Sequence, residues 1–209
     1  MLLIATKNAH KTGEIRAMLG ADWTVTDLTA HPEIPAPEET GDTFQANAEI
    51  KALAASALFP GLVLADDSGL EVDALGGAPG VRSARYAGED ANDADNRAKL
   101  LAELAKKNDS ASPAPDCSLL TAHCSLSPAR FRCAMALAEN GRVLATFSGA
   151  VEGTIIDRER GEGGFGYDSL FIPEGEAKTF GELPAATKNR LSHRARALAQ
   201  VIEYLRRRA

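Results

Sequence analysis

Short apolar runs alternate with helical patterns along this chain, and this alternation limits its fold more than any other feature. Residues 2–6 and 62–65 are apolar runs of the length expected for buried strands. Residues 43–58, 92–107 and 191–208 place apolar side chains at helical spacing. Because strands and helices are interleaved, we predict an α/β fold with a mixed central sheet flanked by helices.

Polar residues indicate where the helices begin. Asn8 precedes apolar residues at helical spacing, and Gly20 stands where a helix-terminating glycine is common. Thr43 precedes an Ala-rich amphipathic stretch, and Ser192 precedes the last one. Each of these three polar side chains can accept a hydrogen bond from a free backbone N–H, so we predict an N-cap at each position.

The second half of the chain is richer in strand signals. Residues 130–138 and 142–149 are expected to pair as a hairpin, because Asn140-Gly141 between them favours a tight turn. Other predicted strands cover residues 23–28, 70–75, 151–156 and 167–172.

The domain organisation follows from length and local composition. The chain has 209 residues, enough for one large domain with its own core, so we predict a single domain over residues 1–209. Residues 108–128 are rich in Ser, Ala and Pro and have weak periodicity. We therefore expect a surface insertion there.

The composition excludes several classes of protein. The net charge is −6, so neither nucleic acid nor an anionic membrane is expected as a partner. No apolar run approaches the roughly 20 residues that span a membrane, and no signal-peptide pattern is visible. Cys117, Cys124 and Cys133 are odd in number and irregular in spacing, which favours free thiols over disulfides or a zinc site. We expect a cytoplasmic location.

The turn after the first predicted strand suits a bound phosphate. Residues 6–11 lead into a helix N-terminus, where backbone N–H groups and the helix dipole favour an anion. Lys7 and Lys11 add positive charge, and Thr6 and Asn8 add polar side chains. The alternative is ordinary helix capping beside two solvated lysines, because the segment lacks the Walker A pattern.

Two carboxylates follow the second buried strand. Asp66 and Asp67 come directly after residues 62–65, and Ser68-Gly69 predicts a turn that lets both carboxylates face one site. Mg²⁺ is usually held by one or two carboxylates together with substrate phosphates. The alternative is a solvated acidic turn.

Other charged residues can complete such a site. Glu38 or Glu39, in a loop rich in Pro and Glu, can supply a further metal ligand, and Lys51 on the next helix can face a phosphate. A solvated loop and a surface lysine are the alternatives. Hydrogen-bond donors also gather before the last helix, at Lys188, His193 and Arg194.

A glycine-rich segment at residues 161–168 formally matches the dinucleotide-binding pattern GxGxxG. That fingerprint needs a strand before it and a helix after it, whereas a strand-like segment follows here, so we reject a dinucleotide site. Phe165 and Asp168 in this loop can still close around a flat base. The alternative is a plain hairpin connection.

Taken together, these segments resemble the inosine triphosphate pyrophosphatase family. The most specific motifs are ADDSGLEVDALGGAPGVRSARYAG (65–88), GGFGYD (163–168) and SHR (192–194), supported by ETGDTFQANAEIKA (39–52). The resemblance implies an elongated mixed sheet, two lobes with a substrate cleft between them, and a homodimer. It also implies Mg²⁺-dependent hydrolysis of non-canonical purine nucleoside triphosphates (ITP, dITP and XTP) to the monophosphate and pyrophosphate.

The resemblance assigns roles to particular residues. Asp67 is implied to be the general base and a metal ligand, with Glu39 and Asp66 as further ligands and Glu38 as the alternative to Glu39. Ser68 and Lys51 are implied to line the site. The implied phosphate-binding residues are Thr6, Lys7, Asn8, Ala9, His10 and Lys11, and the implied nucleotide-binding residues are Phe165, Gly166, Tyr167, Asp168, Lys188, His193 and Arg194.

Base choice can be argued from donor chemistry. His193 and Arg194 are donors that would face the 6-oxo group of hypoxanthine or xanthine and be left unpaired against adenine. We therefore expect Arg194→Ala to weaken selectivity for ITP more than stability. Three alternatives stay open: a pyrophosphatase for canonical nucleotides, a nucleotide-binding regulatory module without turnover, and a nucleic-acid binder that uses Arg206–Arg208.

Overall fold

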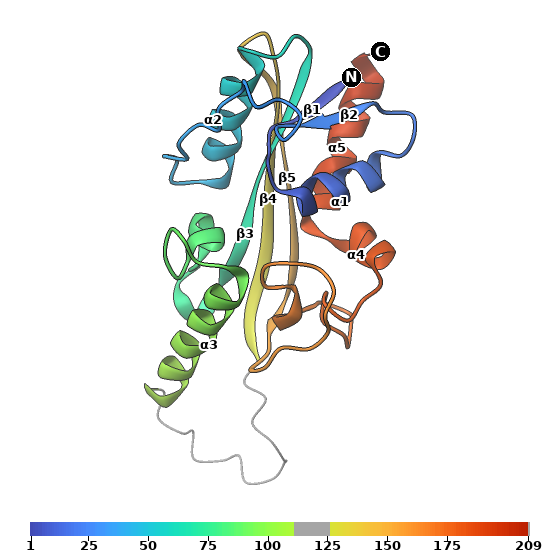
Figure 1. The fold of residues 1–209 in the computed structure, drawn as a ribbon. Coiled ribbons are helices and arrows are strands. Elements are labelled where there is room, and N and C mark those ends of the chain that lie inside the picture. The colour runs from blue at the N-terminus through green and yellow to red at the C-terminus, as the bar shows by residue number, and fades with distance from the viewer. Residues whose placement is uncertain (111–125, 209) are drawn as a thin grey trace. The chain divides into compact units, whose positions relative to one another are not determined.

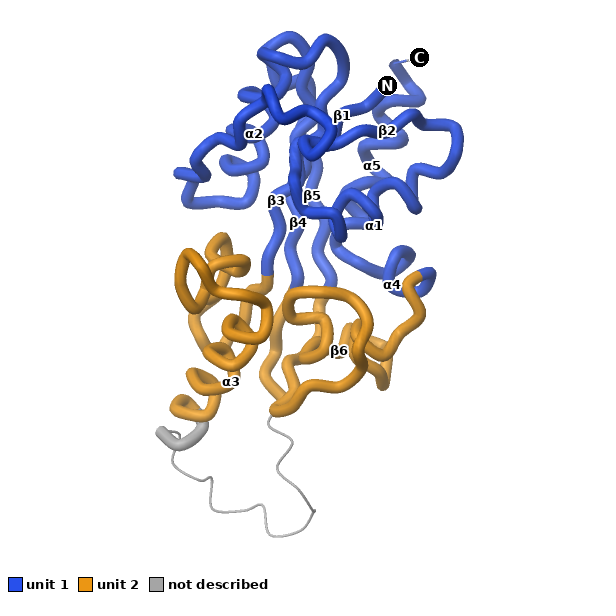
Figure 2. The backbone as a smooth tube through the Cα atoms, viewed as in Figure 1, with its two compact units in different colours: residues 1–69, 131–151, 186–209 blue, residues 70–130, 152–185 orange. Residues whose placement is uncertain are grey.

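The computed structural model describes residues 1–110 and 126–208, and these fall into two compact units (Figure 2). Unit 1 comprises residues 1–69, 131–151 and 186–209, and unit 2 comprises residues 70–130 and 152–185. One six-stranded sheet has the strand order β2 (Val25–Asp27), β1 (Leu2–Ile4), β3 (Leu62–Val72), β4 (Ser127–Glu139), β5 (Arg142–Ile155) and β6 (Phe171–Pro173). The single-domain organisation over residues 1–209 stays a prediction.

Helices and strands are interleaved along the chain (Figure 1). In chain order the elements are β1 (Leu2–Ile4), α1 (Ala9–Leu19), β2 (Val25–Asp27), α2 (Phe44–Ser56), β3 (Leu62–Val72), η1 (Asp73–Leu75), η2 (Gly80–Arg85), α3 (Asp93–Ser110), β4 (Ser127–Glu139), β5 (Arg142–Ile155), η3 (Asp168–Leu170), β6 (Phe171–Pro173), α4 (Ala185–Leu191) and α5 (His193–Arg208).

The sheet contains both parallel and antiparallel pairs. β1 lies parallel to β2 and β3, with Leu2 opposite Val25 on one side and Leu62 on the other. β5 and β6 are antiparallel, with Ile155 opposite Phe171. The predicted α/β class with a mixed sheet flanked by helices is confirmed.

Unit 1 has one apolar layer on each face of its sheet. Val63 and Ala65 of β3 pack in the same cluster as Ala52 of α2. Leu64 of β3 packs instead in the cluster that holds Ile15 of α1 and, from α5, Ala197, Leu198, Val201 and Leu205. Odd-numbered residues of β3 thus face α2 and even-numbered residues face α1 and α5, as the two-residue period of a strand requires.

The hairpin prediction is confirmed. β4 and β5 are joined by Asn140 and Gly141, which have φ values of 51° and 71°. Positive φ at both central residues is the mark of a type I′ turn, whose twist matches that of the flanking strands. The separate strands expected at residues 142–149 and 151–156 form the single strand β5.

All three predicted N-caps are confirmed. The Asn8 side chain accepts from the backbone N–H groups of residues 10 and 11, and Thr43 Oγ1 accepts from the N–H of Ala46. Ser192 Oγ accepts from the N–H of Ala195 at 3.2 Å. The single predicted helix 191–208 is wrong in one respect, because Ser192 separates α5 from a short helix, α4, that the sequence did not indicate.

Two predicted strands are wrong in part. The segment expected as a strand over residues 167–172 begins as the 3-10 helix η3, and only β6 is extended. Asp168 Oδ2 accepts from the N–H of Phe165 at 2.8 Å, a local bond that favours a turn over a ladder. The strand expected at 70–75 continues β3 to Val72 and then ends in η1.

The insertion expected at residues 108–128 falls mostly outside the described residues, as do Cys117 and Cys124. At the edges of this segment, α3 extends to Ser110 and β4 begins at Ser127, and the insertion itself stays a prediction. Among the described residues, no helix is both long and apolar enough to cross a membrane.

Candidate active site

The segment between β1 and α1 forms a polar helix N-terminus in unit 1. Asn8 Oδ1 accepts from the N–H groups of His10 at 2.9 Å and Lys11 at 3.2 Å, and Thr6 Oγ1 accepts from the N–H of Asn8 at 3.1 Å. The first turn of α1 contains no acidic residue. Lys7, Asn8, Ala9 and His10 are exposed. The positive end of the helix dipole is therefore presented to solvent, where it favours an anion.

The turn predicted at Ser68-Gly69 is wrong, because β3 continues as a strand through residues 66–69. Neighbouring side chains on a strand point to opposite faces. Asp66 therefore lies on the face of α1 and α5, and Asp67 lies on the face of α2. The expectation that both carboxylates hold one metal ion is not supported by this arrangement.

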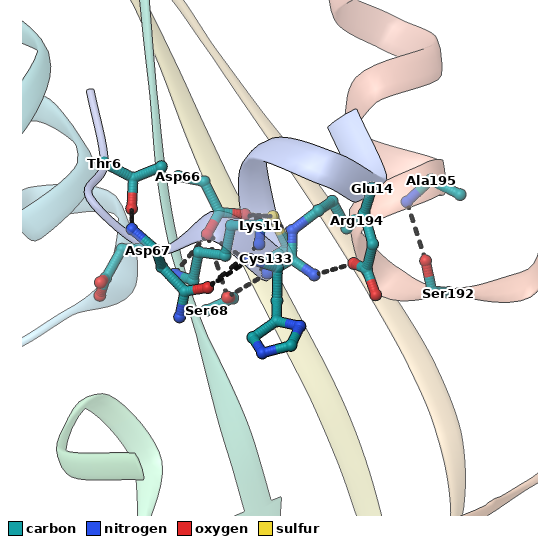
Figure 3. Close-up of polar contacts among 12 residues, drawn as sticks. Thr6, Lys11, Glu14, Asp66, Asp67, Ser68, Cys133, Ser192, Arg194 and Ala195 are labelled. Carbon is teal, nitrogen blue, oxygen red and sulfur yellow. Dashed lines mark hydrogen bonds and ion pairs between the residues drawn. The ribbon is translucent and has the colours of Figure 1, made fainter. Parts of the chain in front are cut away.

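Asp66 is buried among positive charges (Figure 3). Its carboxylate lies 2.6 Å from Lys11 Nζ and 3.1 Å from Arg194 Nε, and it accepts from Cys133 Sγ at 3.0 Å. Burial alone would raise the pKa of Asp66, but the charges of Arg194 and Lys11 outweigh it and hold the pKa well below its usual value. Asp66 is thus an ionised anchor for two cations.

Asp67 faces the polar side of α2. Its carboxylate accepts from Lys51 Nζ at 2.7 Å and from Asn47 Nδ2 at 3.5 Å. Lys51 and Asn47 are four residues apart and share one helix face. Burial raises the pKa of Asp67, and attraction to Lys51 offsets only part of that effect. The pKa of Lys51 is raised, because attraction to Asp67 and Glu39 exceeds the opposing effect of burial.

The acidic loop before α2 brings a second carboxylate to Lys51. Glu39 Oε1 lies 3.1 Å from Lys51 Nζ, whereas Glu38 is exposed. The loop is tied to the helix by the N–H of Gly41, which donates to Asn47 Oδ1 at 2.7 Å. Asn47 is fully buried and holds both this loop and Asp67, a role that the sequence reasoning missed.

The donor cluster before and within α5 is buried. Lys188 and Arg194 Nη1 lie 2.6 Å and 2.5 Å from the two carboxylate oxygens of Glu14. Arg194 Nη2 donates to Ser68 Oγ at 2.8 Å (Figure 3). Glu14 was missed by the sequence reasoning, although it stands three residues after Lys11 on the same face of α1.

His193 packs beside this cluster. Its ring stacks on Phe131, with centroids 4.9 Å apart and planes at 12°. Burial lowers the pKa of His193 well below its usual value, and the charge of Arg194 acts in the same direction. Nδ1 is buried and has no hydrogen-bond partner among the described residues. The ring is therefore neutral at pH 7, with one polar atom left unsatisfied.

The glycine loop belongs to unit 2. Asp168 is buried and holds the N–H of Phe165, while Tyr167 is buried and its hydroxyl donates to the carbonyl oxygen of Ser83 at 2.9 Å. Phe165 and Gly166 are half-buried. Within the loop, Phe165 is the residue whose flat ring is partly accessible, and Tyr167 and Asp168 hold the loop in shape.

The donor set around Lys51 fits a hard cation. Mg²⁺ takes oxygen ligands and needs only one or two carboxylates when a substrate supplies phosphate oxygens. Glu39 and Asp67 converge on one ammonium group, which marks a position where positive charge is stabilised. Among the described residues, no group of three or more His, Cys, Asp or Glu side chains is arranged to hold a metal.

Fold and site together define an α/β protein with a cationic helix N-terminus and a separate pair of carboxylates, an arrangement suited to a phosphorylated anion and a divalent metal. The chain belongs to the Ham1 family, whose model matches residues 2–204. The family resemblance inferred from the motifs is confirmed.

Individual relatives match almost the whole chain. A dITP/XTP pyrophosphatase of Geobacter sulfurreducens is 45% identical over 205 residues, covering 98% of this chain and 96% of the relative. A dITP/XTP pyrophosphatase of Geobacillus kaustophilus is 47% identical over 203 residues, covering 97% and 92%. The solved structure of a HAM1 protein from Coxiella burnetii superposes with a TM-score of 0.82 at 37% identity, covering 99% and 98%.

Proposed function

We propose that this protein is a hydrolase of non-canonical purine nucleoside triphosphates, with dITP, XTP and ITP as substrates. The products would be the nucleoside monophosphate and pyrophosphate. The observation that carries the proposal is the pair of carboxylates, Glu39 and Asp67, that converge on Lys51. The pyrophosphatases of Geobacter and Geobacillus named above support the substrate class.

Unit 1 supplies the groups for phosphate chemistry in this proposal. The N-terminus of α1, from Thr6 to Lys11, binds the triphosphate through the positive end of its helix dipole and the charges of its lysines. Glu39 and Asp67 would hold Mg²⁺, which when bound would neutralise phosphate charge. Lys51 adds a positive charge beside these carboxylates.

The hydrolytic step needs one base and one leaving group. The Asp67 carboxylate accepts a proton from a water molecule, whose oxygen attacks the α-phosphorus. The bond from the α-phosphorus to the bridging oxygen breaks, and that oxygen leaves with pyrophosphate. The raised pKa of Asp67 suits a proton acceptor better than that of Asp66, which is held low by Arg194 and Lys11. We therefore assign Asp66 to positioning Lys11 and Arg194.

Nucleotide-binding roles are proposed for residues of each unit taken separately. In unit 2, Phe165 provides a flat surface for the base, and Gly166, Tyr167 and Asp168 shape its loop. In unit 1, nucleotide-binding roles are proposed for the donor groups of Lys188, His193 and Arg194, and Nδ1 of His193 is buried with no hydrogen-bond partner among the described residues. A 6-oxo purine would suit such donors better than adenine.

Three further parts of the proposal concern the metal, the oligomeric state and the location in the cell. We propose Mg²⁺ as the metal, a homodimer as the assembly and the cytoplasm as the location. The competing candidate is a regulatory module that binds nucleotide without turnover. The buried carboxylate of Asp67 favours the enzyme, because a pure phosphate binder gains nothing from a negative charge near the ligand.

The experiment is a pyrophosphate-release assay on ITP, XTP, dITP, ATP and GTP, with and without Mg²⁺. We expect metal-dependent pyrophosphate from the first three and little from ATP or GTP. Equal turnover of all five would overturn the base assignment, and orthophosphate in place of pyrophosphate would move the attack to another phosphorus. Metal-independent nucleotide binding without any turnover would favour the regulatory module.

A further inference from the structure

Both backbone polar groups of Gly166 are bound by side chains of α3. The N–H of Gly166 donates to Asp93 Oδ2 at 2.6 Å, and its carbonyl oxygen accepts from Arg97 Nη1 at 2.9 Å. Asp93 and Arg97 are four residues apart and lie on one face of the helix. Gly166 has φ of 61°, a left-handed conformation that glycine adopts readily. Its two flanking peptide units therefore cannot rotate without breaking a charge-assisted hydrogen bond.

Arg97 also forms an ion pair with a residue that precedes the glycine loop. Its Nε lies 2.9 Å from Glu159 Oε2, and the Arg97 side chain is 18% exposed. Glu159 in turn accepts from Ser169 Oγ at 3.1 Å. Arg97 thus connects a residue before the glycine loop with a residue inside it, all within unit 2.

The first turn of α3 is held in place by its own hydrogen bonds. The N–H of Asp95 donates to Asn92 Oδ1 at 3.0 Å, and the N–H of Asn92 donates to Asp95 Oδ2 at 3.1 Å. This reciprocal pair is the arrangement of a capping box, which fixes the start of a helix. Asn96 Oδ1 also accepts from the N–H of Ala87 at 2.7 Å, which ties α3 to the segment after η2.

These contacts restrict the backbone around Phe165. Phe165 precedes Gly166, so the peptide unit held by Asp93 contains the carbonyl of Phe165. The N–H of Phe165 is held separately by Asp168 Oδ2. The direction of the Cα–Cβ bond of Phe165 is therefore fixed, and the ring is limited to the staggered rotamers about that bond.

We propose that Asp93 and Arg97 are positioning residues for purine recognition, which hold Phe165 in the orientation that stacks on the base. The inference rests on the proposed function. It assigns no contact with the substrate to either residue. Their effect should appear on substrates that carry a purine and be absent from a triphosphate without a base.

The test compares Arg97→Ala with Arg130→Ala. Arg130 is a matched control because it lies in unit 2 and pairs through Nε with Glu152 at 3.0 Å and through Nη1 with Asp73 at 2.9 Å, outside the glycine loop. We expect Arg97→Ala to raise the KM for ITP about tenfold, the loss expected for one hydrogen bond to a charged group, with kcat changed less than about twofold. The kcat/KM of Arg97→Ala for ribose 5-triphosphate should be unchanged. Arg130→Ala should keep the wild-type kcat and KM for both ITP and ribose 5-triphosphate.

A second pair of variants keeps the test independent of folding. Asp93→Ala should raise the KM for ITP as Arg97→Ala does. Asp93→Asn should leave the KM for ITP close to the wild-type value, because its amide oxygen can still accept a hydrogen bond from the N–H of Gly166. If Arg97→Ala fails to fold, the KM values of Asp93→Ala and Asp93→Asn for ITP test the positioning role instead. Equal values for the two variants would overturn it.

The results that overturn the inference differ from those that overturn the proposed function. An active wild-type protein with equal ITP kinetics in Arg97→Ala and Arg130→Ala removes the positioning role. Equal losses on ITP and ribose 5-triphosphate show a purely structural role and also overturn it. A wild-type protein that releases no pyrophosphate defeats the proposed function instead, and unchanged ITP affinity of Arg97→Ala in calorimetry then defeats the positioning role as well.

Discussion

Asp67 is the residue whose charge matters most to the proposed chemistry. Asp67→Asn removes the proton acceptor, so we expect the rate of pyrophosphate release to fall by about 10²- to 10⁴-fold. The amide oxygen can still accept from Lys51, so the melting temperature should stay close to that of the wild type. Asp22→Asn, at an exposed position, is the control. A folded Asp67→Asn variant with wild-type turnover would remove Asp67 from the mechanism.

Arg194 is expected to matter for stability first, contrary to the expectation from sequence. Its side chain is 1% exposed and bonds Asp66, Glu14 and Ser68. Arg194→Ala leaves Asp66 buried and Glu14 without this partner, which should lower the free energy of unfolding by about 3–5 kcal/mol. Urea unfolding measures the loss. The exposed Arg207, paired with Glu203, provides a control in which alanine should cost almost nothing.

His193 should make the stability of the ligand-free protein depend on pH. Burial and Arg194 lower its pKa in the folded state, with Lys188 and Lys11 acting the same way and Asp66 opposing them. The unfolded chain binds a proton below a pKa of about 6.5. The contribution to stability is therefore complete above about pH 6.5 and falls with pH by up to about 1.4 kcal/mol per unit.

His193→Phe should remove this slope, because a phenyl ring can still stack on Phe131 and carries no titratable group. The measurement is the free energy of unfolding between pH 7 and pH 5.5 for both proteins, without nucleotide or metal. Parallel curves for the wild type and the variant would show that another group controls the acid sensitivity.

At the scale of elements, the N-terminus of α1 has two roles that one substitution can separate. Asp is as good an N-cap as Asn, so Asn8→Asp should keep the stability of the helix. The added negative charge repels a triphosphate, so the KM for ITP should rise while the melting temperature does not fall. An unchanged KM would mean that the phosphates bind elsewhere. Asn8→Ala, which loses the cap, should cost about 0.5–2 kcal/mol.

Elements defined by local chemistry were predictable from the sequence. Asn8, Thr43 and Ser192 cap helices because each bonds a backbone N–H two or three residues further on. Asn140-Gly141 forms its turn because both residues tolerate positive φ. In these cases the signal and the structure that it specifies lie within a few residues of each other.

Features decided by distant contacts were not predictable. Ser68-Gly69 has the composition of a turn, but β3 continues through it, with Asp66 neutralised by Lys11 and Arg194 from other elements. Asp66 and Asp67 are neighbours in sequence and lie on opposite faces in the fold. Glu14 was missed because its partners, Lys188 and Arg194, are more than 170 residues away. The candidate site was therefore predictable as a set of residues, and its division between two faces was not.

For the whole molecule, the charge distribution argues against the nucleic-acid alternative. The net charge is −6, and of the basic residues at the end of α5, Arg207 pairs with Glu203 and Arg208 pairs with Glu139 at 2.9 Å. Few unneutralised cations are left on this segment to release counterions from DNA.

We therefore expect no binding to a short labelled duplex at protein concentrations up to about 100 µM, at about 50 mM or about 200 mM salt. Fluorescence anisotropy measures this, with the variant that carries Arg206→Ala, Arg207→Ala and Arg208→Ala beside the wild type. The variant should also keep wild-type pyrophosphate release, because the residues of α5 with a proposed role, His193 and Arg194, lie at the opposite end of that helix. Affinity that falls steeply with salt and disappears in the variant would instead show that the end of α5 binds nucleic acid.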